Sequence, residues 1–93
     1  MERYRTCLNR GVLVGAAATR AWLGAYYGDW SEAERYIGFA SIHLKNAQED
    51  GCLSPAESAR LAQLMRGYTD AVRSRDLNRV IDQSKRFEGA FRG

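Results

Sequence analysis

The chain has 93 residues, of which 45% are hydrophobic and 27% charged, and its formal net charge at pH 7 is +3. This length accommodates one domain, residues 1–93, and the composition excludes a disordered chain. Ala, Leu, Arg and Glu are common while Val, Ile and Thr are few, so the sequence predicts an all-α domain.

The first predicted helix runs from about Glu2 to Tyr27 and ends at Gly28, a residue suited to a left-handed stop. Residues 11–19 within it carry no charge. A basic start followed by an apolar run resembles a short signal peptide, but Arg20 interrupts the run. The run is also far shorter than the roughly 20 residues that a membrane span needs. We expect neither a leader nor contact with a membrane.

Small residues lie close to one face of this helix, at Gly11, Gly15 and Ala18. A smooth face lets a second helix approach closely. The neighbouring residues 12–17 are mostly apolar too, and a helix that is apolar all round must be buried all round. Two arrangements satisfy this requirement: a central helix in the monomer, or a helix at the interface of a homodimer. We expect self-association through Gly11, Gly15 and Ala18.

The second helix is expected to begin near Ser31, because Ser31 and Glu34 have the spacing of a capping box, and to stop near Gly51. The third has a stronger start, with Ser54 as cap, Pro55 at the first helical position and Glu57 completing the box. The fourth begins after Asp76. All connections are short, which favours antiparallel neighbours. The sequence thus predicts a four-helix antiparallel bundle or two stacked helical hairpins.

The two cysteines, Cys7 and Cys52, are 45 residues apart and have no histidine or further cysteine nearby. We interpret them as reduced, mostly buried thiols of a cytoplasmic protein. His43 is the only histidine, and we interpret it as a surface or hydrogen-bonded residue. No spacing indicates a catalytic, metal or cofactor site, so we expect no enzyme, no metal and no cofactor.

Residues 28–44 resemble the turn and second helix of a tetratricopeptide repeat. The positions that match are Gly28, Asp29, Trp30, Ala33, Ile37 and Ala40. The upstream residues 22–27 lie about three positions too close to the turn, and Lys45 stands where that family has proline. The resemblance covers about a third of the chain, and it implies a peptide- or protein-binding helical module.

The function we expect is that of a protein-binding adaptor, small chaperone or regulatory module that forms a homodimer. Aromatic residues are enriched where binding energy concentrates, and five exceed the apparent needs of the core. These candidate partner-binding residues are Trp22, Tyr26, Tyr27, Trp30 and Tyr36. The alternative is that several of them simply fill the core.

A second function, nucleic-acid binding, would use the arginines of the second half, Arg66, Arg73, Arg79 and Arg86. Asp70 lies between the first two and Asp82 between the last two, which is typical of a solvated, salt-bridged surface. Arginine makes up twelve of the fourteen basic residues. That excess fits phosphate or carboxylate recognition, but a codon bias is the interpretation that we favour.

Overall fold

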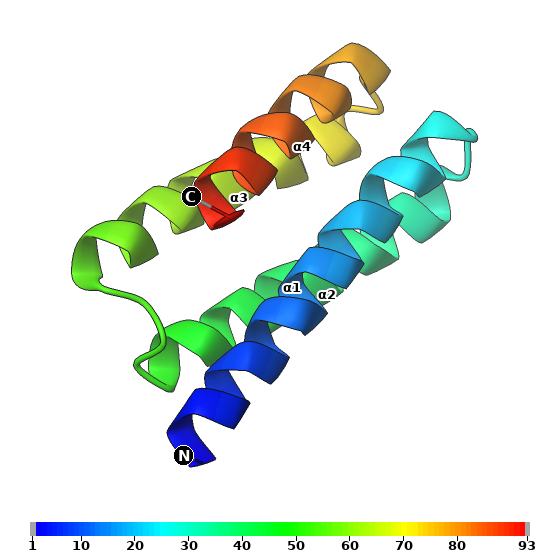
Figure 1. Ribbon diagram of the computed structural model, residues 1–93. Coiled ribbons are helices and arrows are strands. Elements are labelled where there is room, and N and C mark those ends of the chain that lie inside the picture. The colour runs from blue at the N-terminus through cyan, green and yellow to red at the C-terminus, as the bar shows by residue number, and fades with distance from the viewer. Residues whose placement is uncertain (1, 93) are drawn as a thin grey trace.

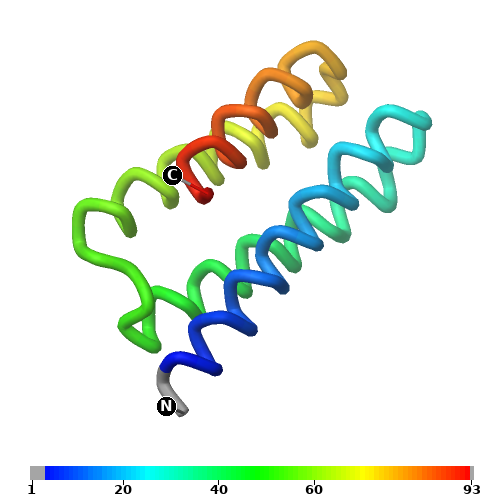
Figure 2. Tube along the Cα trace, in the orientation of Figure 1, coloured from blue at the N-terminus to red at the C-terminus, as the bar shows by residue number. Residues whose placement is uncertain are grey.

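A computed structural model describes residues 2–92, with side chains from Tyr4 onward. Its described residues form four helices: α1 (Glu2–Tyr26), α2 (Trp30–Glu49), α3 (Pro55–Arg73) and α4 (Leu77–Arg92). Successive helices run antiparallel, so that α1 with α2 and α3 with α4 make two hairpins joined by the connection from α2 to α3 (Figures 1 and 2). The predicted fold class, an all-α bundle of four antiparallel helices, is confirmed.

A residue with a left-handed backbone conformation follows the end of each of the first three helices. Gly28 (φ 79°) follows α1 and Gly51 (φ 70°) follows α2, as their positions in the sequence indicate. The third turn contains Arg75 at φ 54°, although a side chain makes this conformation less favourable than it is for glycine. Each turn is tight, which is why neighbouring helices lie antiparallel.

The start of α2 corrects the sequence prediction. The helix begins at Trp30, and its cap is Asp29, whose carboxylate accepts a hydrogen bond from the Glu32 backbone N–H. Ser31 lies inside the first turn and is not the cap. An aspartate at the cap stabilises the N-terminal end of a helix both by this hydrogen bond and by its charge.

The start of α3 is as predicted. The Ser54 hydroxyl accepts from the Glu57 N–H at 3.2 Å, and the Glu57 carboxylate accepts from the Ser54 N–H at 3.0 Å. These bonds lower the pKa of the Glu57 carboxyl below its usual value, because they favour the charged form.

Ser54→Ala should therefore lower the free energy of unfolding by about 1 kcal/mol. Thermal unfolding followed by circular dichroism measures this change. Ser54→Asp, which keeps an acceptor at the cap, is the matched control and should retain most of the stability. Equal loss in both variants would mean that the cap hydrogen bond contributes nothing.

The core lies between the helices and consists mainly of small and aliphatic side chains from α1 and α2 and larger ones from α3 and α4. The largest fully buried side chains are Tyr68, Phe87, Val14, Val72 and Val80. In α1 and α2 most buried positions are alanines, so these two helices approach closely. At Gly24 an added Cβ would lie 3.0 Å from the Ala33 backbone nitrogen. Glycine is therefore required at this position, because any side chain would be too close to the backbone of α2.

Each helix packs against its neighbours in the chain, and α1 also packs against α4. The four helices thus form a closed ring. The contact between α1 and α4 is less extensive than that between α1 and α2. In Figure 1 the two hairpins lie alongside one another and are joined at one end by the connection between α2 and α3.

The expectation of two reduced thiols is wrong. Cys7 in α1 and Cys52, which follows α2, form a disulfide with a Cα–Cα distance of 5.4 Å. Both residues are half-buried. The long separation in sequence concealed this proximity: antiparallel α1 and α2 bring the start of one helix beside the end of the other. An ion pair between Arg10 and Asp50, at 3.0 Å, joins the same two ends.

Within residues 2–92, none of the four helices is both long enough and apolar enough to cross a bilayer.

Candidate interaction surface

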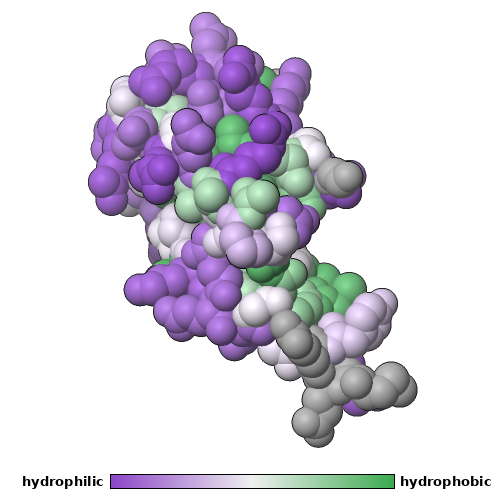
Figure 3. All heavy atoms as spheres, turned by 90° about the vertical axis from the view of Figure 1, so that its left-hand side faces the viewer, coloured by the Kyte–Doolittle hydropathy of each residue, from purple (hydrophilic) through white to green (hydrophobic). Residues whose placement is uncertain are grey.

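One side of α1 is apolar and exposed along nearly its whole length. We call this side the outer face of α1. Its residues follow one another at spacings of three or four and are all exposed: Tyr4, Leu8, Val12, Ala16, Thr19, Leu23 and Tyr26. Exposure reaches 71% at Tyr4 and 62% at Val12. In Figure 3 apolar residues gather beside the N-terminal end of α1, whereas the part of that view formed by α3 and α4 is mainly hydrophilic.

The prediction that α1 is buried all round is therefore wrong for the single chain. Val14, Ala17 and Ala21 are buried, but Val12 and Leu13 on other sides of the helix are exposed. Of the two arrangements left open by the sequence, a central position in the monomer is excluded. Large exposed apolar patches are rare on monomeric proteins and usually mark an interaction site.

The small residues predicted to mediate self-association lie against α4 of the same chain. A Cβ at Gly11 would lie 3.8 Å from the ring of Phe91, and one at Gly15 would lie 4.0 Å from it. Ala18 is in the core, and its carbonyl oxygen accepts a hydrogen bond from the Tyr68 hydroxyl at 2.6 Å. Because Gly11 and Gly15 have no side chains, the ring of Phe91 can pack against them. These two glycines are therefore partly covered by α4 and remain only partly exposed to solvent.

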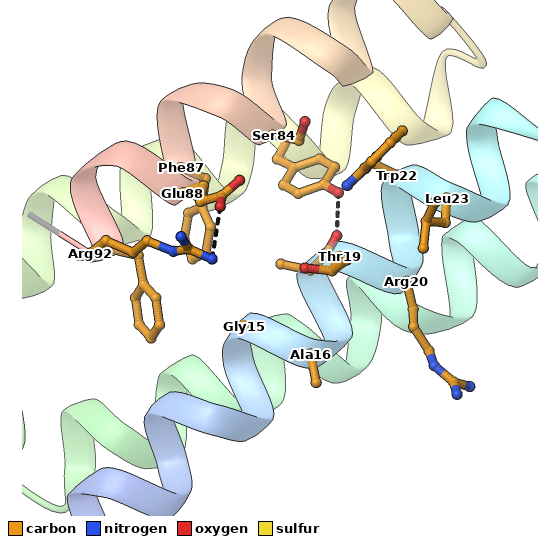
Figure 4. A pocket seen from close by; sticks show the side chains of 13 residues that line it. Gly15, Ala16, Thr19, Arg20, Trp22, Leu23, Ser84, Phe87, Glu88 and Arg92 are labelled. Atoms are coloured by element: carbon orange, nitrogen blue, oxygen red, sulfur yellow. Dashed lines mark hydrogen bonds and ion pairs between the residues drawn. The ribbon is translucent and has the colours of Figure 1, made fainter.

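Beside that contact lies a pocket of about 420 Å³ between α1 and α4. Gly15, Thr19 and Trp22 line it from α1 and Phe87 lines it from α4 (Figure 4), and Phe91 of α4 also lines it. An ion pair between Arg92 and Glu88, at 3.0 Å, lies at its edge. Three residues of the outer face, Ala16, Thr19 and Leu23, also line this pocket, so the outer face of α1 borders it.

Tyr68 of α3 also lines the pocket. Burial raises the pKa of its phenol well above the usual range, because the charged form would lose its hydration. The neutral hydroxyl donates to Ala18, which fixes the distance between α3 and α1. This residue has a structural role.

The five aromatic residues predicted to bind a partner separate into two groups. Trp22, Trp30 and Tyr36 are half-buried and pack against the core. Tyr26 and Tyr27 are exposed, Tyr27 to 80%. Only Tyr26 belongs to the outer face of α1, where its ring meets that of Trp22 edge to face at 5.9 Å.

Tyr36 is held in place by its neighbours. Its hydroxyl accepts a hydrogen bond from Arg20 at 2.8 Å, and the guanidinium groups of Arg20 and Arg35 each lie 5.3 Å from its ring centre. Cations near an aromatic face are attracted to the ring. These contacts account for the placement of Tyr36 within the chain, without a partner.

A smaller exposed apolar area lies on α2, where Phe39 and Ile42 are exposed to 45% and 57%. His43 beside them is half-buried, and its Nδ1 atom is buried without a hydrogen-bond partner. This area spans about one helical turn and is much shorter than the outer face of α1.

The four arginines of the second half are spread over three separate places. Arg66 and Arg73 line a depression between α2 and α3, and Arg86 lines one between α3 and α4. Arg79 is exposed on α4. Arg86 is also paired with Asp82 at 3.0 Å, as the interleaved acids predict. The arginines do not form a single continuous basic surface.

Sequence reasoning missed most of the outer face of α1. Tyr4, Leu8, Val12 and Leu23 were not among the predicted contact residues, although Tyr4, Leu8 and Val12 follow one another at i, i+4 and i+8. That spacing alone does not distinguish an exposed row from a core stripe.

No protein family, no curated protein and no solved structure gives a significant match to this chain. The resemblance of residues 28–44 to a tetratricopeptide repeat therefore stays a prediction. Among residues 2–92, no group of three or more potential metal-ligating side chains lies together.

Proposed function

We propose that the protein is a protein-binding helical module and that the outer face of α1 is its contact surface. The supporting observation is the length of this face, which extends from Tyr4 to Tyr26 without an acidic residue. Seven exposed residues at helical spacing match the way one helix docks along another, with anchors at i, i+3, i+4 and i+7.

The energetics of docking also favour this surface. Tyrosine and large aliphatic side chains supply contact area at a small entropic cost, and Tyr26 and Tyr4 lie near its two ends. The disulfide and the closed ring of helices hold α1 in one conformation, so little conformational freedom is lost on binding. Adaptor, chaperone and regulatory roles all require such a preformed surface.

Nucleic-acid binding receives less support, because Arg66 and Arg73 line one depression, Arg86 lines another, and Arg86 is paired with Asp82. Phosphate contacts act together when they follow one backbone. The cytoplasmic location expected from the sequence rested on reduced thiols. Disulfides persist mainly in oxidising compartments, so the oxidation state of Cys7 and Cys52 in the source cell tests that prediction.

Capture experiments with three immobilised proteins test the proposed function. Wild type, Leu23→Glu and the control Ile42→Glu are exposed to extract of the source cells at low salt and at high salt. We expect a protein that wild type and Ile42→Glu both retain and that Leu23→Glu loses. Its retention should persist at high salt, since apolar contacts are not screened.

Two results would contradict this proposal. One is retention of the same proteins by all three baits. The other is capture of nucleic acid alone, released as the salt concentration rises and unaffected by Leu23→Glu.

A further inference from the structure

The outer face of α1 has an internal symmetry. Its residues are arranged about a centre at Gly15 and Ala16: Tyr4 and Tyr26 are equidistant from residue 15, and Leu8 and Leu23 are equidistant from a point between 15 and 16. Val12 and Thr19 flank the same point. Large side chains thus lie toward both ends of the face, and small ones lie at its middle.

A two-fold dimer requires this kind of pattern, because in such an interface the same surface of each copy must complement itself. When two α1 helices cross antiparallel between Gly15 and Ala16, Tyr4 faces Tyr26 of the second copy and Leu8 faces Leu23 of the second copy. The small residues at the crossing point let the two backbones approach within the usual 8–10 Å of packed helices. We propose that the occupant of the outer face of α1 is a second copy of this chain, bound in this antiparallel register.

The charges permit this pairing. Arg5 and Arg20 are the charged residues nearest to the face, and between Leu8 and Thr19 the exposed side contains none. Arg5 falls opposite Tyr26 and Tyr27 of the second copy, where a guanidinium over an aromatic ring is favourable. No like charges are opposed across the crossing point.

The available area is sufficient for a weak dimer. Exposure of the five large side chains ranges from 37% at Leu23 to 71% at Tyr4. Two of the five are aromatic, with roughly 150–250 Å² each, and three are smaller aliphatic side chains, so at these exposed fractions the five together offer on the order of 500 Å² per copy. Two copies then bury up to about 1,000 Å², which falls in the range of weak, transient interfaces. We therefore expect dissociation in the micromolar range and not an obligate dimer.

This inference rests on the proposed function, since both use the outer face of α1, and it specifies the partner. Sedimentation or light scattering between 1 and 500 μM should show wild type passing from about 10.5 kDa to twice that mass. Val12→Glu should raise the dissociation constant at least about tenfold, because two carboxylates would be buried near the axis. Leu13→Glu is the control: it adds the same charge one residue away, at an exposed leucine that points to another side of α1.

Cross-linking tests the register. With a short bismaleimide, Ala16→Cys should link to itself, and a mixture of Leu8→Cys and Leu23→Cys should link together while neither protein links alone. Wild type, with its cysteines oxidised, gives the background. A monomer at all concentrations, or an equal effect of Val12→Glu and Leu13→Glu, would overturn the dimer. Self-linking of Leu8→Cys would overturn the antiparallel register.

These outcomes separate the two proposals. A monomer that still captures another protein in a manner sensitive to Leu23→Glu would contradict the dimer and leave the binding module supported. A monomer with no such capture would contradict both.

Discussion

Cys7→Ser should lower the free energy of unfolding by about 4 kcal/mol, because the Cys7–Cys52 bond closes a loop of 45 residues that is otherwise free in the unfolded chain. Domains of this size have a total stability of about 5–15 kcal/mol, so the loss is a large fraction. Guanidinium unfolding at 25 °C measures it. Cys52→Ser, and wild type treated with a reductant, should show the same decrease.

The ion pair between Arg10 and Asp50 provides the control, since it joins the same ends of α1 and α2 without a covalent bond. Both side chains are about one-third exposed, and such pairs contribute less than about 1 kcal/mol. Arg10→Ala should therefore change stability only slightly. Wild type with an unchanged unfolding midpoint under reducing conditions would contradict the prediction and would show that helix packing alone holds these ends together.

Helix boundaries were predictable from the sequence because the signals that set them are local. Ser54, Pro55 and Glu57 fix the start of α3 through contacts within four residues. Gly28 and Gly51 end their helices because glycine adopts a positive φ readily. The start of α2 near Ser31 was predicted to within one residue, but the capping residue was not: Asp29, which immediately follows Gly28, caps the helix in place of Ser31.

Features that depend on distant residues were not predictable. The proximity of Cys7 and Cys52 follows from the antiparallel packing of α1 on α2 and from the length of both helices. The exposure of Val12 depends on where α4 lies, and α4 covers Gly15 through Phe91 while leaving Val12 open. The division of the arginines likewise results from the position of α3 between α2 and α4.

The aromatic residues illustrate this difference most clearly. Composition alone left them as either core or contact residues. The arrangement of helices makes Trp22 and Trp30 part of the core surface and leaves Tyr26 and Tyr27 in solvent. Binding experiments should therefore use Tyr26 and not the tryptophans, whose loss would weaken the fold and binding together.

Phe87→Ala should cost about 3–5 kcal/mol of stability, as the loss of a fully buried aromatic side chain usually does. The ring is 1% exposed, stacks on Phe91 with ring centres 5.6 Å apart, and lies 6.4 Å from the ring of Tyr68. Its removal would join a new cavity to the pocket between α1 and α4 and would leave Phe91 without its stacking partner.

Tyr26→Ala is the matched control for this variant, because it removes an aromatic ring of similar size from an exposed position on the outer face of α1. Surface substitutions usually change stability by less than about 0.5 kcal/mol. Thermal unfolding of both variants at a protein concentration below the dissociation constant of the dimer measures the stability of the monomer, without a contribution from self-association. Equal stability of the two variants would show that Phe87 contributes nothing to core packing, whereas a large loss in Phe87→Ala alone would show that this α4 side chain stabilises the core.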